Sequence, residues 1–128
     1  MEQTSTLADF LEQYSRKRPD DVFRVNEDVD VEYESTAYYK LLEDKNPLIW
    51  FSKVKSYPDF QLATNVMGSR ARMAVALGLD SESNFYDTWN RALISKSEIR
   101  ISDESPPIKE RVFEGEHVDL YSLPVIKH

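Results

Sequence analysis

Apolar residues recur every three or four positions in several segments of the chain, which is the spacing of one face of an α-helix. The first segment has apolar residues from Leu7 to Tyr14 and begins with a possible capping box, in which Thr6 and Asp9 cap each other. A helix is therefore expected from there to about Ser15. Three more helices are expected over residues 33–42, 69–78 and 85–93.

The residue types in these segments also predict which side chains are buried and how the third helix ends. Ser69 is the expected N-cap of that helix, and Gly78 is the expected glycine just beyond its last turn. The apolar face of the second helix is expected to be Tyr33, Ala37, Tyr38, Leu41 and Leu42. The buried stripe of the fourth helix is expected to be Phe85, Trp89, Ala92 and Leu93.

Short runs of β-branched and aromatic residues between the helices predict strands at 22–25, 48–51 and 60–66. The run Leu48–Phe51 is apolar at every position, which is typical of a strand buried on both faces. Helices alternating with short strands indicate an α/β (α+β) fold, with a small mixed sheet and about four helices. The pattern leaves the order and direction of the strands open.

The character of the chain changes after residue 94. Residues 95–107 are polar, lack periodicity and include a Pro-Pro pair, so they are expected to be a linker. A strand is expected at Lys109–Phe113, a turn at 114–119 and an apolar segment at 120–126 that packs onto another surface. We therefore expect a small α/β domain over 1–94, and a linker with a first strand over 95–128.

Composition and charge exclude several classes of function. The chain has 128 residues, enough for one domain, and a net charge of −7, which opposes binding to nucleic acid or to anionic membranes. It has no cysteine, so it forms no disulfide and holds no thiolate metal site. No apolar run is long enough to span a membrane, and the amino terminus lacks the features of a signal peptide. A cytoplasmic location is expected.

Three polar clusters are candidates for chemistry, and each also has a structural explanation. The acidic stretch Glu27–Glu32 could bind a metal or form a solvated turn. His117, within Glu114–Asp119, could contribute to a metal site, but neighbouring residues rarely converge on one ion. Lysines and aromatic residues alternate over 53–60, as in proteins that bind single strands, although a surface loop is the ordinary explanation.

The junction Gly68–Arg72 is the fourth candidate. A strand, a glycine and a helix start with two arginines could bind an anion, but a phosphate loop would have more glycines and a lysine. The alternative is a helix cap with two solvent-facing arginines, Arg70 and Arg72. No catalytic, cofactor-binding or metal-binding residue is assigned to any position of the chain.

The order of short motifs along the chain resembles the amino-terminal domain of UbiD-type, prenylated-flavin-dependent decarboxylases. Residues 7–11 resemble the family's L-R-D-F-L opening, and Asp28–Asp30 resembles its later V-D step. Residues 49–57 are similar to L-L-F-E-N-V-K-G-Y, and residues 65–78 to N-x-F-G-S-R-x-R-x-A-x-A-L-G. Residues 107–128 are similar to P-V-K-E-x-V-x-x-G-x-x-V-D-L-x-x-L-P-I-x-x-H. The chain departs from the family at Val31, Ser52 and Ser56.

The resemblance implies the organisation of a complete enzyme. Members of the family carry this domain, a central split-barrel domain that binds prenylated FMN with a divalent metal (Mn or Mg) and potassium, and a domain for oligomerisation. They reversibly decarboxylate aromatic or α,β-unsaturated acids. The family's catalytic and cofactor-binding residues lie beyond the segment matched here, so none is expected on this chain, and residues 95–128 would lead toward the split barrel.

Three hypotheses about function remain open from the sequence. The chain could be a non-catalytic domain of a UbiD-like decarboxylase, inactive alone and part of a homo-oligomer when complete. It could be a small structural subunit that docks on separate catalytic subunits. It could also be an unrelated small enzyme or ligand-binding domain that uses the Gly68–Arg72 junction to bind an anion.

Overall fold

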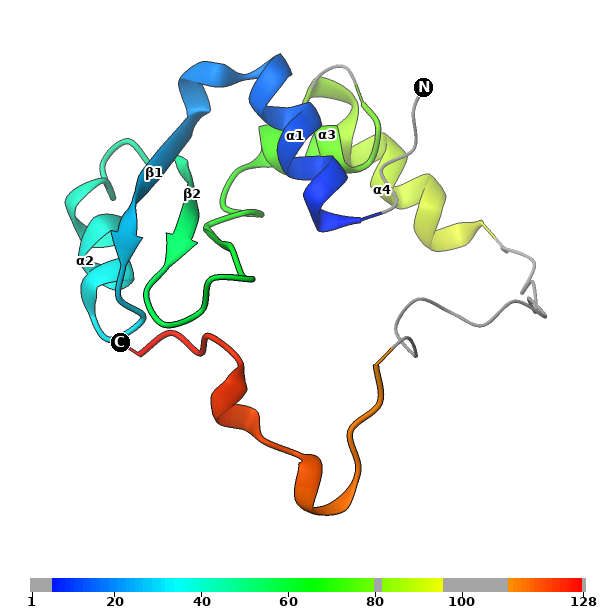
Figure 1. Cartoon of the computed structure of the whole chain (residues 1–128). Helices are drawn as coiled ribbons and strands as arrows, with labels where there is room; N and C mark the ends of the chain where they lie inside the picture. Colours follow the sequence, from blue (N-terminus) through cyan, green and yellow to red (C-terminus); the bar gives the residue numbers. More distant parts are fainter. Residues whose placement is uncertain (1–5, 80–81, 96–110, 128) are drawn as a thin grey trace.

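A computed structural model describes residues 6–79, 82–95 and 111–127 (Figure 1). Its helices and strands are α1 (Leu7–Lys17), η1 (Pro19–Asp21), β1 (Val22–Val29), α2 (Glu34–Leu41), β2 (Leu48–Val54), β3 (Leu62–Thr64), α3 (Arg70–Ala76), η2 (Glu82–Asn84), α4 (Phe85–Ile94), η4 (Gly115–His117) and η5 (Leu120–Ser122), where η marks a 3₁₀ helix.

The strands form a mixed sheet in the order β1-β2-β3. β1 and β2 are parallel, with Val22 opposite Leu48, and β2 and β3 are antiparallel, with Ile49 opposite Thr64. The helix α2 connects the two parallel strands, as a parallel pair requires. Figure 1 shows α2 on one side of the sheet and α1 and α3 on the other. The predicted α/β fold with a small mixed sheet is confirmed.

The central strand β2 supplies side chains to two hydrophobic clusters, one on each face of the sheet. Leu48 and Trp50 pack with α1, whose buried residues are Phe10, Leu11 and Tyr14. Successive strand side chains point to opposite faces. Ile49 and Phe51 therefore point to the opposite face from Leu48 and Trp50. There they pack with Val25 and Val29 of β1 and with side chains of α2. The prediction that this strand is buried on both faces is confirmed.

The predicted start of α1 and both predicted ends of α3 are also confirmed, while α1 continues past the predicted Ser15 to Lys17. Thr6 and Asp9 form a reciprocal capping box, in which each backbone N–H donates to the other side chain at 3.1 Å. In α3 the hydroxyl of Ser69 accepts a hydrogen bond from the backbone of the third helical residue. Gly78 has a φ of 72°, and its N–H and that of Leu79 donate to carbonyls of the last turn at 2.9 Å.

The acidic stretch differs from its prediction, because β1 continues through it to Val29. Val29 is fully buried against β2, and this burial favours strand over turn. The turn comes afterwards, where the backbone N–H of Asp30 donates to the carboxylate of Glu34 at 2.7 Å. β3 is shorter than predicted, since only Leu62–Thr64 pair with β2.

The predicted faces of α2 and α4 are partly wrong. Tyr33, just before α2, and Leu41 are 63% and 80% exposed, while Ser35 is buried. The helix begins only after Tyr33, whose backbone is left-handed. In α4 only Phe85 is buried, and Trp89, Ala92 and Leu93 are exposed. α4 packs chiefly against α3 and η2, and this small contact covers one end of its apolar stripe.

The described part of the carboxyl-terminal segment, 111–127, runs back to the α/β layers (Figure 1). The N–H of Lys127 donates to the carbonyl of Val31 at 2.9 Å, and the N–H of Tyr33 donates to the carbonyl of Lys127 at 3.2 Å. Of the strand predicted at 109–113, residues 109 and 110 lie outside the described residues, and 111–113 have no strand partner there. The domain boundary near residue 94 stays a prediction.

The two-sided burial of β2 predicts a difference between two phenylalanines. Phe51 is fully buried and Phe23, on β1, is 41% exposed. Phe51→Ala is expected to lower the free energy of unfolding by about 3–5 kcal/mol, and Phe23→Ala by less than about 2 kcal/mol. Urea denaturation of both variants measures the difference. Equal losses would contradict the burial of Phe51 in the cluster with Val25 and Val29.

Candidate functional site

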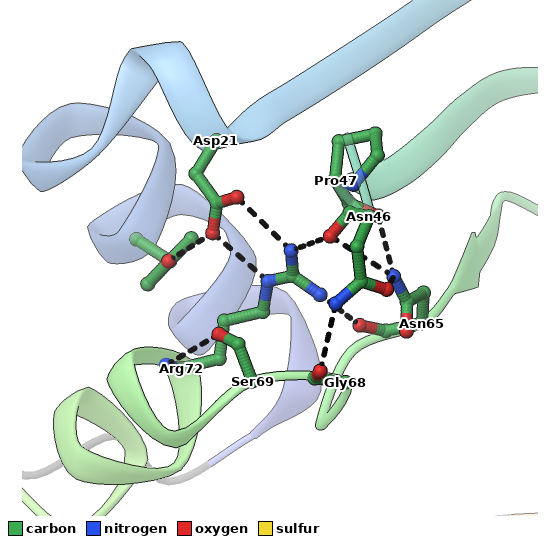
Figure 2. Close-up of polar contacts among 8 residues, drawn as sticks. Asp21, Asn46, Pro47, Asn65, Gly68, Ser69 and Arg72 are labelled. Atoms are coloured by element: carbon green, nitrogen blue, oxygen red, sulfur yellow. Dashed lines mark hydrogen bonds and ion pairs between the residues drawn. The ribbon is translucent and has the colours of Figure 1, made fainter. Parts of the chain in front are cut away.

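The two arginines of the Gly68–Arg72 junction have opposite environments. Arg70 is exposed, and its guanidinium lies 5.2 Å from the ring centroid of Tyr86. Arg72, on α3, is 0% exposed, and its side chain points toward Asp21 at the end of η1 (Figure 2). The interpretation that both arginines face solvent is therefore wrong for Arg72. Its position in the sequence gives no sign of this, because both are polar residues in the first turn of a short helix.

The guanidinium of Arg72 is held by a carboxylate and by backbone carbonyls (Figure 2). Its Nε donates to Asp21 Oδ2 at 2.9 Å and its Nη2 donates to Asp21 Oδ1 at 3.0 Å, a bidentate pair. Nη1 donates to the carbonyl of Asn65 at 2.7 Å, and Nη2 also donates to the carbonyl of Asn46. A buried charge is tolerated when it is paired and hydrogen-bonded in this way.

Asp21 has a second donor, the phenol of Tyr14, whose hydroxyl lies 2.5 Å from Asp21 Oδ2. Burial raises the pKa of Asp21, but the hydrogen bonds from Arg72 and Tyr14 outweigh it and hold the pKa below its usual value. The pKa of Tyr14 is raised to about 12, mainly by burial and secondly by the hydrogen bond to Asp21. At neutral pH Asp21 is therefore ionised and Tyr14 keeps its proton.

Two asparagines fix the carbonyls that Arg72 uses. Asn46 and Asn65 have φ of 48° and 58°, in the left-handed region that asparagine tolerates better than most residues. The side-chain amide of Asn65 donates to Asn46 Oδ1 at 2.7 Å and to the carbonyl of Pro47 at 2.8 Å. That of Asn46 donates to the carbonyl of Gly68 at 2.9 Å. A Cβ on Gly68 would lie 1.7 Å from Asn65 Oδ1, so the close approach requires glycine.

This arrangement is built to hold the protein together, and it offers little to an external anion. Asp21 neutralises the charge of Arg72, and the guanidinium donors point to Asp21 and the carbonyls. Ser69 uses its hydroxyl to cap the backbone N–H of Arg72 at 3.2 Å. Of the cationic groups proposed for an anion site, Arg70 alone remains open to solvent.

The other candidate clusters are dispersed in the structure. Within residues 6–79, 82–95 and 111–127, no group of three or more acidic or histidine side chains is placed to hold a metal ion. Asp30 pairs with Lys55 at 3.0 Å. The pKa of Asp30 is lowered most by the hydrogen bond from the backbone N–H of Glu32, and next by the hydrogen bond from Lys55. Glu32 pairs instead with Lys127, and His117 is exposed in η4.

The lysine-aromatic stretch also has structural partners. The Tyr57 hydroxyl donates to the carbonyl of Tyr121 at 3.0 Å, and the Tyr57 ring packs edge-on against Phe60. With Lys55 paired to Asp30, this stretch joins the sheet to the carboxyl-terminal segment rather than forming a stacking platform.

Among the described residues, no helix is both long and apolar enough to cross a membrane.

The sequence pattern does not single out Asp21 or Tyr14, which complete the Arg72 network. Asp21 follows another aspartate in a short polar turn, and Tyr14 fits equally well as an ordinary core residue. The nearest signal is the N-x-x-G-S-R-x-R pattern over residues 65–72, whose asparagine, glycine, serine and second arginine all belong to the network. The carboxylate partner lies 51 positions away in the chain.

Fold and network together define a small α/β domain organised around the ion pair between the buried Arg72 and the partly buried Asp21. The chain belongs to the UbiD amino-terminal domain family: its residues 15–92 match the family described as 3-octaprenyl-4-hydroxybenzoate carboxy-lyase N-terminal domain. That stretch contains Asp21, Asn46, Asn65 and Arg72. All of the network except Tyr14 therefore lies within the matched stretch.

A curated relative agrees with this assignment. The chain is 34% identical over 89 residues to a phenolic acid decarboxylase from Streptomyces sp. (strain D7), an alignment that covers 63% of this chain and 18% of the relative. The chain thus corresponds to less than a fifth of the length of that protein.

The structural role of Arg72 predicts a large stability effect. Arg72→Met keeps most of the side-chain volume but leaves Asp21 partly buried without its cation, and is expected to lower the free energy of unfolding by about 3–5 kcal/mol. The matched control Arg70→Met changes an exposed side chain and is expected to cost less than about 1 kcal/mol. Urea denaturation compares the two. Similar values would mean that the network does not stabilise the fold.

Asp21 predicts how stability depends on pH. Because its pKa is lower in the folded state, its contribution is complete above the unfolded value of about 3.9 and is lost as the pH falls through the folded value. Asp21→Asn is expected to be less stable than the wild type at pH 7, and the difference should shrink below about pH 4. The control is Asp20→Asn, which alters an exposed neighbour. A difference that stays constant from pH 7 to pH 3 would contradict the assignment.

Proposed function

We propose that this chain is the non-catalytic amino-terminal domain of a UbiD-like carboxy-lyase and that it packs against the catalytic part of that enzyme. The observation that carries the proposal is the uncovered apolar surface of α4, in a chain that matches 18% of a decarboxylase. Trp89, Leu93 and Ile94 are 47%, 69% and 82% exposed. Contiguous apolar surface of this kind marks a site of contact with other protein.

The carboxyl-terminal segment supports the same proposal. Phe113, Leu120 and Tyr121 are 65%, 70% and 90% exposed, although main-chain hydrogen bonds of Lys127 tie the end of the segment to the α/β layers. A segment anchored at one end with its large side chains in water is suited to bury them against a second surface. Burial contributes roughly 25 cal/mol for each Å² of apolar area removed from water.

In this proposal the chemistry belongs to the remainder of the enzyme. The substrate would be an aromatic or α,β-unsaturated acid, supported by the relative's name as a phenolic acid decarboxylase and by the carboxy-lyase description of the family. Prenylated FMN, with Mn or Mg and potassium, would supply the electron sink for reversible loss of carbon dioxide. The described residues of this chain do not fit that group, because they place no set of metal ligands together and Arg72 is already paired.

The alternative is a separate small subunit that docks on UbiD-like catalytic chains. The same exposed residues of α4 would form its interface, so the surface alone does not distinguish the two arrangements. Homo-oligomerisation and a cytoplasmic location remain predictions in both cases.

The mass of the protein in its native source distinguishes the arrangements. The protein would be isolated with an antibody to this chain and measured by intact mass spectrometry under denaturing conditions. A mass several times 14.9 kDa identifies a domain of a longer chain, and a mass of 14.9 kDa together with a larger co-purifying chain identifies a subunit. A 14.9 kDa chain that elutes alone would contradict both.

The proposed interface predicts the effect of a charge on α4. Leu93→Asp places a carboxylate on a side chain that is 69% exposed, so the isolated chain should lose less than about 1 kcal/mol of unfolding free energy. In the native protein the same charge would be buried against the catalytic part, where an unpaired charge costs several kcal/mol. Thermal denaturation of the native protein should show a lowered midpoint.

Asn26→Asp is the matched control, because it adds one negative charge at an exposed position of β1. It should leave the native protein unchanged. If Leu93→Asp and Asn26→Asp behave alike in the native protein, α4 is not the contact surface.

A further inference from the structure

The backbone between β1 and α2 is strained at Tyr33. This residue has φ of 66° and ψ of −28°, in the left-handed region. There the Cβ comes too close to the following carbonyl oxygen, so the conformation is uncommon for a residue as bulky as tyrosine. The ring gains little from packing in return, because Tyr33 is 63% exposed. A strained backbone of this kind persists only where other contacts hold it.

The end of the carboxyl-terminal segment supplies such contacts. The N–H of Tyr33 donates to the carbonyl of Lys127 at 3.2 Å, and the N–H of Lys127 donates to the carbonyl of Val31 at 2.9 Å. Together they make a parallel bridge between Glu32 and Lys127, where the chain comes back beside α2 in Figure 1. The Thr36 hydroxyl donates to the same Lys127 carbonyl at 3.3 Å, and the Lys127 side chain pairs with Glu32.

The turn at Tyr33 also has hydrogen bonds of its own. The N–H of Glu34 donates to the carbonyl of Glu32 at 2.8 Å, which closes a three-residue turn around Tyr33. Turns of this kind with a positive φ are rare and strained. This local bond therefore belongs to the strained geometry, whereas the bond from Lys127 reaches Tyr33 from a distant part of the chain.

The segment itself is attached by few contacts. Besides the bonds at Lys127, the carbonyl of Tyr121 accepts a hydrogen bond from the Tyr57 hydroxyl at 3.0 Å. Tyr121, Leu123 and Val125 are 90%, 46% and 63% exposed, so docking buries little of their apolar surface. Segments with few buried apolar contacts open at a much lower free energy than the core does.

We propose that residues 120–127 form a strap that docks on the α/β layers and leaves them as a unit, and that Tyr33 is left-handed only while the strap is docked. On release, Tyr33 returns to an ordinary backbone conformation, and the start of α2 changes with it. The strain at Tyr33 weakens docking, so the strap is set to release readily. The inference depends on this chain alone and does not rest on the proposed function.

Native-state hydrogen exchange of the Lys127 amide tests the strap in two matched variants. Tyr33→Ala and Tyr33→Gly both remove the exposed ring, but Tyr33→Gly alone also removes the Cβ that causes the strain. Lys127 is far from Tyr33 in the sequence, so neither change alters its intrinsic exchange rate. The Lys127 amide is expected to be about threefold more protected in Tyr33→Gly than in Tyr33→Ala, because glycine adopts the left-handed region freely. Tyr33→Ala should match the wild type.

The same exchange data can overturn the proposal in two ways. If the Lys127 amide exchanges with the free energy of the core amide of Phe51, the strap does not leave separately. If Tyr33→Gly and Tyr33→Ala protect Lys127 equally, Tyr33 stays left-handed when the strap is released.

A second pair of variants tests the coupling through global stability. Lys127→Pro removes the N–H that bonds to Val31 and should undock the strap, whereas Lys127→Ala keeps this N–H. In the Lys127→Ala background, urea denaturation should find Tyr33→Gly more stable than Tyr33→Ala. In the Lys127→Pro background this advantage should be absent or reversed, since glycine then costs more to order than alanine. An advantage of the same size in both backgrounds would contradict the coupling.

Discussion

The guanidinium of Arg72 lies out of water, and the carboxylate of Asp21 holds it through two hydrogen bonds. Through this pair α3 is tied to the start of β1, and through the phenol of Tyr14 it is tied to α1. Removing either charge leaves the other poorly compensated, so the pair strongly constrains how these elements pack. The carbonyls of Asn46 and Asn65 complete the network. They extend this constraint to the loop before β2 and to the loop after β3.

This constraint explains why the motif over residues 65–72 combines glycine with polar residues. Asn65 adopts a left-handed backbone and aims its carbonyl at Arg72, Gly68 leaves room for the Asn65 side chain, and Ser69 caps the helix that carries the arginine. Each of these residues therefore has a structural role. The pattern over residues 65–72 suggests an anion site in the sequence, but in the structure it holds the guanidinium of Arg72 inside the protein.

The sequence predicts those features that depend on neighbouring residues. The capping box of Thr6, the glycine at 78 and the apolar run of β2 were all located correctly, because local chemistry determines them. The burial of Arg72 and the exposure of Leu93 were not, because they depend on which surface lies opposite. In α4 the apolar stripe is real, but the described chain covers only its beginning. This failure agrees with the proposal that another part of the enzyme covers the rest.

Native-state hydrogen exchange tests the central claim most directly, since it reports whether elements open separately or together. If the Arg72 network joins α3 to α1 and the sheet, the helical amides of Tyr14 and Ala74 and the strand amide of Phe51 will exchange with one shared free energy, equal to that of global unfolding. If Ala74 exchanges through a separate, much cheaper opening while Tyr14 and Phe51 stay protected, α3 is only loosely attached and the network does not organise the fold.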